Sequence, residues 1–223
     1  MAKNFLALIG SPRPNSTSSY LAQYLTDGMA QRGWQTRTLI ACQAARQPQK
    51  WTALEEAFHE ADVVGIVTPL YVDSLPAELT QTLEKLATGR SDRSIRLFAV
   101  VNCGFVEAIH NDVALDICRL FARDAGLRWM GGLAIGGGGM FEGKPLKEQG
   151  GAARHITAAF DQTIAVLDAG GDIPDSAISG IRKAPIPEWA YFTMANLGMA
   201  LGAAKYGNLF KIGAKPYPGK KTA

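Results

Sequence analysis

The chain has little that would direct it to nucleic acid or across a membrane. Its 23 basic and 20 acidic side chains leave a formal net charge of +3 over 223 residues. This charge is too small and too evenly spread to predict a nucleic-acid-binding surface. The longest apolar stretch without a charged residue, Trp189 to Ala204, is shorter than the roughly 20 residues of a membrane-spanning helix and contains Asn196. We therefore expect neither a nucleic-acid partner nor a membrane span.

Cysteine and histidine are also scarce. Cys42, Cys103 and Cys118 are odd in number and widely spaced, unlike a disulfide framework or the paired ligands of a zinc or iron-sulfur site. The three histidines lie in or near helix-like segments, where a solvated or capping histidine is the default interpretation. The first apolar run, Asn4 to Ile9, is too short for the core of a signal peptide. We expect reduced thiols, no metal site and a cytoplasmic location.

Short apolar runs alternate with longer amphipathic segments, the pattern of βαβ units. Strands are predicted over Asn4–Ile9, Gln35–Ala41, Asp62–Thr68, Ile95–Asn102 and Leu127–Ile135. Helices are predicted over Ser18–Arg32, Trp51–Ala61, Pro76–Gly89, Glu107–Ala125 and Ala152–Leu167. This α/β pattern predicts an open parallel sheet with helices on both faces. Ligands of such sheets lie beyond the carboxyl ends of the strands.

The composition changes after Gly171, where prolines precede an apolar, helix-like stretch and a basic tail. We predict a core domain over residues 1–171 and an extension over residues 172–223, with its helical segment at about 187–210. Aromatic and methionine side chains in that segment favour core packing or dimerisation over contact with a membrane surface. The reason is that interfacial helices normally carry basic residues along one face, whereas these basic residues lie almost wholly beyond the apolar stretch.

The loop after the first predicted strand carries the clearest chemical signal. Five hydroxyl side chains and one arginine lie between Gly10 and Ser19, directly before a helix. Unpaired N–H groups and the helix dipole favour an anion at that place, and Arg13 adds a charge-assisted contact. An ordinary polar N-cap would explain only one or two of these residues. Neither G-x-x-x-x-G-K-[ST] nor G-x-G-x-x-G occurs, so we predict a phosphate site of another kind.

With the sequence G-S-P-R-P-N-S-T-S at residues 10–18, this loop resembles the phosphate loop of the flavodoxin-like NAD(P)H-dependent FMN reductases. The resemblance covers roughly residues 4–170. It implies a flavodoxin-like three-layer sandwich with strand order 2-1-3-4-5, plus the C-terminal helical extension. The loop over residues 68–77, in which a proline and an aromatic precede a proline-started helix, is similar to the family's second flavin loop. The loop over residues 102–105 lies where the family has its third flavin loop, and it keeps only part of the glycine-rich sequence usual there.

The resemblance implies that three loops bind FMN. The phosphate contacts would come from Ser11, Arg13, Asn15, Ser16, Thr17 and Ser18. The isoalloxazine contacts would come from Pro69, Leu70, Tyr71 and Val72, and from Asn102, Cys103, Gly104 and Phe105. Plain loop packing remains the alternative for the last four residues. No catalytic acid or base is assigned, because the flavin itself accepts the hydride.

A run of four glycines, Gly136 to Gly139, follows the fifth predicted strand. We expect these four glycines to have no packing function. With the residues up to Gly143, the run suggests a mobile lid that borders the nicotinamide or second-substrate site. A flexible connector is the alternative.

The leading functional hypothesis is an oxidoreductase that passes electrons from NADPH or NADH through FMN to free flavin, a quinone or another small-molecule acceptor. The resemblance also implies a homodimer. The alternative is a non-enzymatic electron carrier that serves a protein partner. A phosphoacceptor receiver domain would need an aspartate at the end of the third strand, where Thr68 and Pro69 stand. An iron-sulfur flavoprotein would need a cysteine cluster that this sequence lacks.

Overall fold

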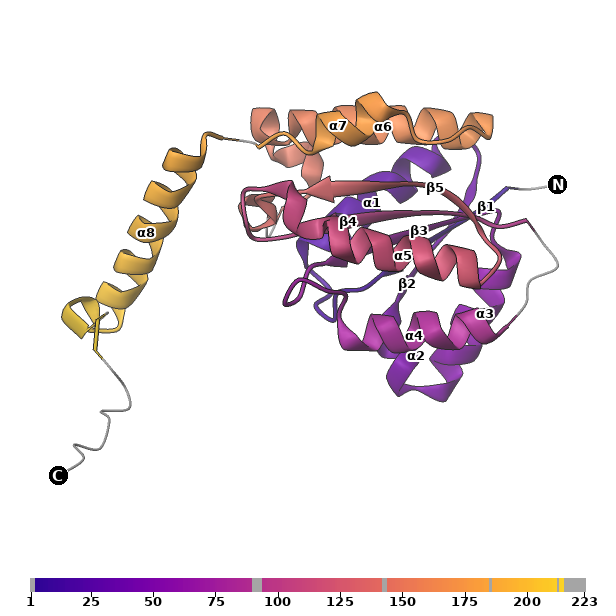
Figure 1. Cartoon of the computed structure of the whole chain (residues 1–223), viewed down its shortest axis with the longest axis horizontal. Helices are drawn as coiled ribbons and strands as arrows, with labels where there is room; N and C mark the ends of the chain where they lie inside the picture. Colours follow the sequence, from indigo (N-terminus) through magenta and orange to yellow (C-terminus); the bar gives the residue numbers. More distant parts are fainter. Residues whose placement is uncertain (1–2, 90–93, 142–143, 185, 212, 215–223) are drawn as a thin grey trace. The chain divides into compact units, whose positions relative to one another are not determined.

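The computed structural model describes residues 3–89, 94–141, 144–184, 186–211 and 213–214. The chain divides into two compact units, Met1–Pro185 and Ile186–Ala223. The first unit is built on a five-stranded sheet (Figure 1). Its strands are β1 (Asn4–Ile9), β2 (Gln35–Ile40), β3 (Val63–Pro69), β4 (Arg96–Asn102) and β5 (Arg128–Ile135). All pairs are parallel, in the order β2-β1-β3-β4-β5, which confirms the predicted sheet.

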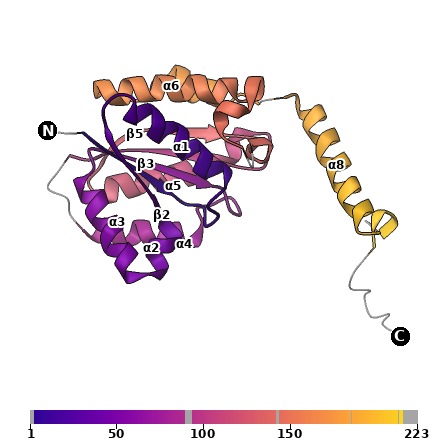
Figure 2. The ribbon, with the colours of Figure 1, turned by 180° about the vertical axis from the view of Figure 1, so that it is seen from behind.

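Helices cover both faces of the sheet, as the strand composition requires (Figure 1). One face carries α1 (Thr17–Ala30), α6 (Arg154–Ala169) and α7 (Asp175–Ile181). The other carries α2 (Ala41–Arg46), α3 (Pro48–Glu60), α4 (Ala77–Thr88) and α5 (Asp112–Asp124). Figure 2 shows α1 crossing the sheet on the same side as α6. The result is the predicted three-layer sandwich.

Alternating side chains of each central strand supply two separate apolar cores. In β1, Phe5 and Ala7 belong to the core under α1 and α6, while Leu6 and Leu8 belong to the core under α3 and α4. This alternation follows from the two-residue period of a strand. A strand with both faces covered is therefore apolar throughout, as β3 is, whereas the edge strand β2 is largely polar.

Several helix boundaries differ from the sequence prediction for local reasons. The helix that was predicted to begin at Trp51 is α3, and it begins at Pro48, because proline fits the first helical position well. Pro76 is the N-cap of α4 rather than its first residue. The predicted helix from Glu107 begins as a 3₁₀ turn, η1 (Ala108–Asn111), before α5. Further 3₁₀ turns are η2 (Gly138–Phe141), η3 (Leu146–Glu148), η4 (Gly150–Ala153) and η5 (Leu209–Lys211).

The packed core continues past residue 171, where the sequence analysis ended the core domain. Ile173, Ala177 and Ile181 are buried in the core on the α1 and α6 side. Their four-residue spacing places one face of α7 against the sheet. The first compact unit therefore extends to Pro185.

The second unit is helical. Its main helix, α8 (Glu188–Lys205), has no buried residue, and η5 follows it. Large apolar side chains are exposed along its length, including Trp189, Met194 and Leu201. None of the helices in the described ranges combines the length and hydropathy needed to cross a membrane.

Candidate functional site

The loops that follow β1, β3 and β4 are joined at one buried side chain. Asn102, the last residue of β4, is 5% exposed. Its side-chain Nδ2 donates to Ser18 Oγ at 2.9 Å and to the Thr68 carbonyl at 3.0 Å. Its backbone carbonyl accepts from the Leu70 N–H at 2.8 Å. Because parallel strands end at the same edge of the sheet, one amide fixes the relative positions of three loops.

The first loop leaves β1 through a glycine that has no room for a side chain. The Gly10 N–H donates to the Val67 carbonyl at 2.9 Å. A Cβ atom at Gly10 would lie 2.3 Å from Thr68 Oγ1 and 2.8 Å from Leu79 Cδ2. Only glycine therefore lets the chain turn this close to β3 and enter α1.

The start of α1 gathers donors for an anion. Ser16 is the N-cap, and its Oγ accepts from the Ser19 N–H at 3.2 Å. The N–H groups of Thr17 and Ser18, in the first turn, have no acceptor within the helix. These N–H groups lie at the amino-terminal end of the helix, which is the positive end of the helix dipole. Ser11 and Ser16 are buried beside them, and Arg13 and Asn15 are exposed in the same loop. This set of backbone and hydroxyl donors fits a phosphate group.

The glycine run after β5 is a packed junction. The Thr17 hydroxyl donates to the Gly138 carbonyl at 3.1 Å, and the Gly138 N–H donates to the Cys103 carbonyl at 2.7 Å. A Cβ atom at Gly136 would lie 2.1 Å from the Val106 carbonyl oxygen. The expectation that these glycines have no packing role is therefore wrong for Gly136 and Gly138. Residues 142 and 143, at the end of the predicted lid, lie outside the described residues.

The loop after β3 ends in a strained turn. The Tyr71 N–H donates to the Ser74 carbonyl at 2.9 Å, and the Ser74 N–H donates back at 3.1 Å. Between them, Val72 and Asp73 have φ angles of 50° and 56°. Two positive φ angles are typical of a type I′ turn, which favours Asn and Gly. A β-branched residue in this region is a genuine outlier, and Val72 is 97% exposed. Such strain is concentrated at functional sites.

We expect Val72→Asn to stabilise the protein by about 1 kcal/mol, because asparagine tolerates a positive φ at lower cost. The rise in the free energy of unfolding is measured by urea denaturation. Val113→Asn is the matched control, since Val113 is also an exposed valine but lies within α5. It should give no comparable gain. Equal responses of the two variants would show that Val72 is not strained.

The loop after β4 supplies one exposed aromatic ring and a buried thiol. The Cys103 thiol donates to the Phe105 carbonyl and accepts from Asn111 Nδ2 at 3.5 Å. Burial raises the pKa of Cys103, which disfavours the reactive thiolate. Phe105 is 56% exposed, and its ring centroid lies 4.5 Å from that of His110. The thiol therefore has a structural position, and the Phe105 ring is free on its outer face.

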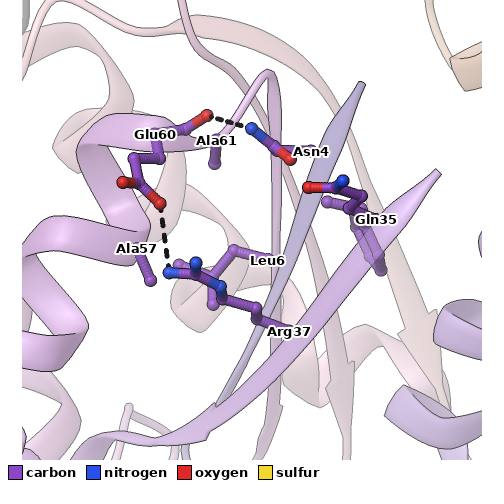
Figure 3. Close-up of a pocket in the computed structure, with 8 residues that line it drawn as sticks. Asn4, Leu6, Gln35, Arg37, Ala57, Glu60 and Ala61 are labelled. Carbon is purple, nitrogen blue, oxygen red and sulfur yellow. Dashed lines mark hydrogen bonds and ion pairs between the residues drawn. The ribbon is translucent and has the colours of Figure 1, made fainter. Parts of the chain in front are cut away.

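A small polar pocket at the other edge of the sheet does not compete with this site. It lies at the amino-terminal ends of β1 and β2 (Figure 3), with a volume of about 20 Å³, room for roughly one water molecule. Its charged groups are already paired, with Arg37 Nη1 3.1 Å from Glu60 Oε2. Asn4 Nδ2 donates to the Glu60 carbonyl at 3.0 Å. Within the described part of the chain, no group of three His, Cys, Asp or Glu side chains is placed to hold a metal.

Comparison with a protein-family model supports the resemblance. Residues 4–108 match the family model described as NADPH-dependent FMN reductase. Over these residues, just under half of the chain, the protein is similar to the NADPH-dependent FMN reductase family. The matched segment contains the phosphate-site loop, the strained turn and Asn102. In general terms, the chain is an NAD(P)H-dependent flavin oxidoreductase, which confirms the resemblance seen in the loop sequences. No curated protein matches the chain significantly.

Solved structures confirm the flavodoxin-like fold at low sequence identity. A putative quinone reductase from Klebsiella pneumoniae is similar with a TM-score of 0.55 and 16% identity, covering 78% of this chain and 88% of that one. An NAD(P)H:quinone oxidoreductase from Methanothermobacter marburgensis has a TM-score of 0.53 and 15% sequence identity, and the match covers 75% of this chain and 100% of that one. A flavodoxin from Streptococcus pneumoniae TIGR4 has a TM-score of 0.52 and 16% sequence identity, and the match covers 74% of this chain and 99% of that one.

The structure places the predicted site residues in two groups. Buried at the loop junction are Ser11, Ser16, Thr17, Ser18, Asn102 and Cys103. Exposed around it are Arg13, Asn15, Tyr71, Val72, Gly104 and Phe105, with Pro69 and Leu70 half-buried at the end of β3. Sequence reasoning missed Thr68, Asn111 and Gly138, which are the bonding partners of these residues. A buried polar residue at the end of an apolar strand, such as Thr68, was the available signal.

Proposed function

We propose that the chain binds FMN across the loops after β1, β3 and β4 and uses NADPH or NADH to reduce free flavin, a quinone or another small molecule. The observation that carries this proposal is the junction at Asn102. It brings the start of α1, with its anion donors, beside the loop that carries the exposed Phe105 ring. Bound FMN supplies hydride acceptance and onward electron transfer, while the chain binds and orients it.

The phosphate would be held mainly by backbone. The Thr17 hydroxyl donates to Gly138 and Ser18 Oγ accepts from Asn102, so these side chains hold loops together. Their backbone N–H groups are the donors proposed for the phosphate, with the hydroxyls of Ser11 and Ser16. Arg13, exposed in the same loop, adds a charge-assisted contact. Asn15 is the remaining proposed polar contact.

The ring would lie over the two other loops. The Leu70 and Tyr71 N–H groups are bonded to Asn102 and Ser74. The Val72 N–H is therefore the backbone donor that we propose for the polar edge of the isoalloxazine. Gly104 is exposed, and an added Cβ there would meet nothing within 4 Å, so a planar ligand can approach its backbone closely. Phe105 offers a ring face for stacking.

Comparing FMN with riboflavin tests the phosphate site directly. We expect FMN to bind more tightly, and Arg13→Ala to weaken FMN binding about 10-fold while leaving riboflavin unchanged, because only FMN carries the phosphate. Flavin fluorescence titration gives both affinities. Arg119→Ala, which removes an exposed arginine of α5 paired with Asp116, is the control. Equal affinities for the two flavins would refute the phosphate assignment.

The reductase and carrier alternatives differ in their response to nicotinamides. Under anaerobic conditions, NADPH or NADH should bleach the absorption bands of the FMN-loaded protein. Bound flavin that neither nicotinamide bleaches would contradict the reductase proposal and favour the non-enzymatic carrier. Flavin that bleaches would leave the acceptor to be found by assaying free flavin and quinones.

A homodimer is the proposed assembly. Exposed apolar side chains of η1 and α5, namely Ile109, Val113 and Leu120, continue from Phe105 along one helix surface. Contiguous apolar surface of this kind marks interaction sites, and this surface begins beside the proposed flavin site. We expect light scattering at micromolar concentration to give twice the chain mass of 23.9 kDa. A monomer at that concentration would contradict the proposal.

A further inference from the structure

The second unit contains an apolar helix that this unit itself does not bury. In α8, no residue is buried, and Trp189, Leu197 and Met199 are 73%, 59% and 65% exposed. Apolar residues surround the helix instead of forming one stripe, and such a helix needs an apolar environment on most sides. The Thr193 hydroxyl donates to the Trp189 carbonyl at 2.7 Å, so it does not oppose transfer out of water. Asn196 is the one amide side chain in the helix.

Aromatic side chains lie at both ends of this helix. Trp189 and Tyr191 are in its first turn, and Tyr206 follows its last residue. Tyr206 is 75% exposed and Phe210, in η5, is 99% exposed. Tryptophan and tyrosine are enriched where apolar and aqueous regions of a bilayer meet, because their rings have an apolar body and a polar edge.

The charge of the segment has one sign. After Glu188, the sequence contains no acidic residue and five lysines, Lys205, Lys211, Lys215, Lys220 and Lys221. Lys205 and Lys211, in the described part, are exposed at the carboxyl end of the segment. Each lysine near an anionic membrane surface strengthens binding by about fivefold. A dimer interface gains nothing from a cluster of like charges, whereas anionic headgroups are complementary to it.

We propose that the second unit binds anionic lipid surfaces, with α8 entering the headgroup and acyl boundary and with Lys205 and Lys211 contacting the lipid phosphates. On sequence alone, packing or dimerisation was favoured, because the basic residues lie almost wholly beyond the apolar stretch. A lysine at the end of an apolar helix can, however, keep its ammonium group at the headgroups while its methylene stem lies against apolar surface. This proposal does not depend on flavin binding.

Vesicle sedimentation with the full-length protein tests the proposal. We expect binding to vesicles of phosphatidylglycerol and phosphatidylcholine, little binding to phosphatidylcholine alone, and weakening with added salt. Lys205→Glu with Lys211→Glu should weaken binding at least about 25-fold, from two contributions of about fivefold. Lys50→Glu with Lys183→Glu changes the net charge equally on the first unit and should have little effect.

Tryptophan fluorescence reports whether α8 itself enters the lipid. Of the four tryptophans, Trp189 is the one in the second unit, and it is 73% exposed, so a blue shift on vesicle binding should come from Trp189. Trp189→Phe should still sediment with vesicles but lose most of the shift. Leu197→Asp with Leu201→Asp should abolish binding, and far-UV circular dichroism checks folding.

Failure to sediment with anionic vesicles would overturn the proposal, as would binding that both the lysine and the leucine variants leave unchanged. Self-association that requires α8, without vesicle binding, would show that a second copy covers the helix. That outcome would also overturn the proposal. None of these readouts uses flavin, so they separate failure here from failure of the proposed oxidoreductase function.

Discussion

Replacing Gly136 with alanine is expected to destabilise the protein by about 3 kcal/mol, near the upper end of the usual cost of overpacking. The added Cβ would lie 2.1 Å from the Val106 carbonyl oxygen, 2.7 Å from its carbonyl carbon and 3.1 Å from the Ala108 nitrogen. All three are backbone atoms, so no side-chain rotation relieves the clash. The loop after β5 must then move away from the loop after β4.

Gly139→Ala is the matched control within the same glycine run. An alanine Cβ at this position would meet nothing within 4 Å, so we expect a change within about 0.5 kcal/mol, as for most exposed substitutions. Urea denaturation followed by circular dichroism gives both values. If the two variants were equally stable, the run would be a flexible connector, which was the alternative drawn from the sequence, and the packed junction would be wrong.

Gly136→Ala should also weaken FMN binding. Gly138 donates to the Cys103 carbonyl, and its own carbonyl accepts from the Thr17 hydroxyl. Moving the glycine run therefore shifts the start of α1, where the proposed phosphate donors lie. Binding by Gly139→Ala should remain near that of the unmodified protein.

The sheet was predictable because burial on both faces leaves a strong signal in composition. β3 and β4 are apolar almost throughout and are bounded by polar or glycine-containing loops. The short helices left weaker signals. α2 covers six residues and α7 seven, which is about two turns and too few for a helical period to stand out. Their packing against other elements stabilises them.

The site was predictable at the level of loops. Parallel strands end at one edge, so the loops after β1, β3 and β4 were expected to meet there. Their contacts were not, because Asn102 bonds residues 84 and 34 positions away in the sequence. The turn at Val72 gave no local signal either, because neither central residue is the glycine or asparagine that such a turn prefers.

Replacing Asn102 with alanine is expected to lower the free energy of unfolding by about 2 to 3 kcal/mol. The substitution removes two hydrogen bonds, to Ser18 Oγ and to the Thr68 carbonyl, and both groups are buried. A buried polar atom left without a partner costs more than the bond alone contributes. Without the hydrogen bonds of the Asn102 side chain, the three loops should shift, and FMN affinity should fall by at least about 10-fold.

A double-mutant cycle with Ser18→Ala separates the Asn102–Ser18 bond from general damage to the core. Ser18→Ala should weaken stability less in the Asn102→Ala background than in the unmodified protein, because the bond is then already absent. Asn208→Ala, at an exposed position of the second unit, should change neither stability nor FMN affinity. Strict additivity of the two site substitutions would show that they are energetically independent. Asn102 would then not couple the start of α1 to the end of β4, and the flavin site would need another organising residue.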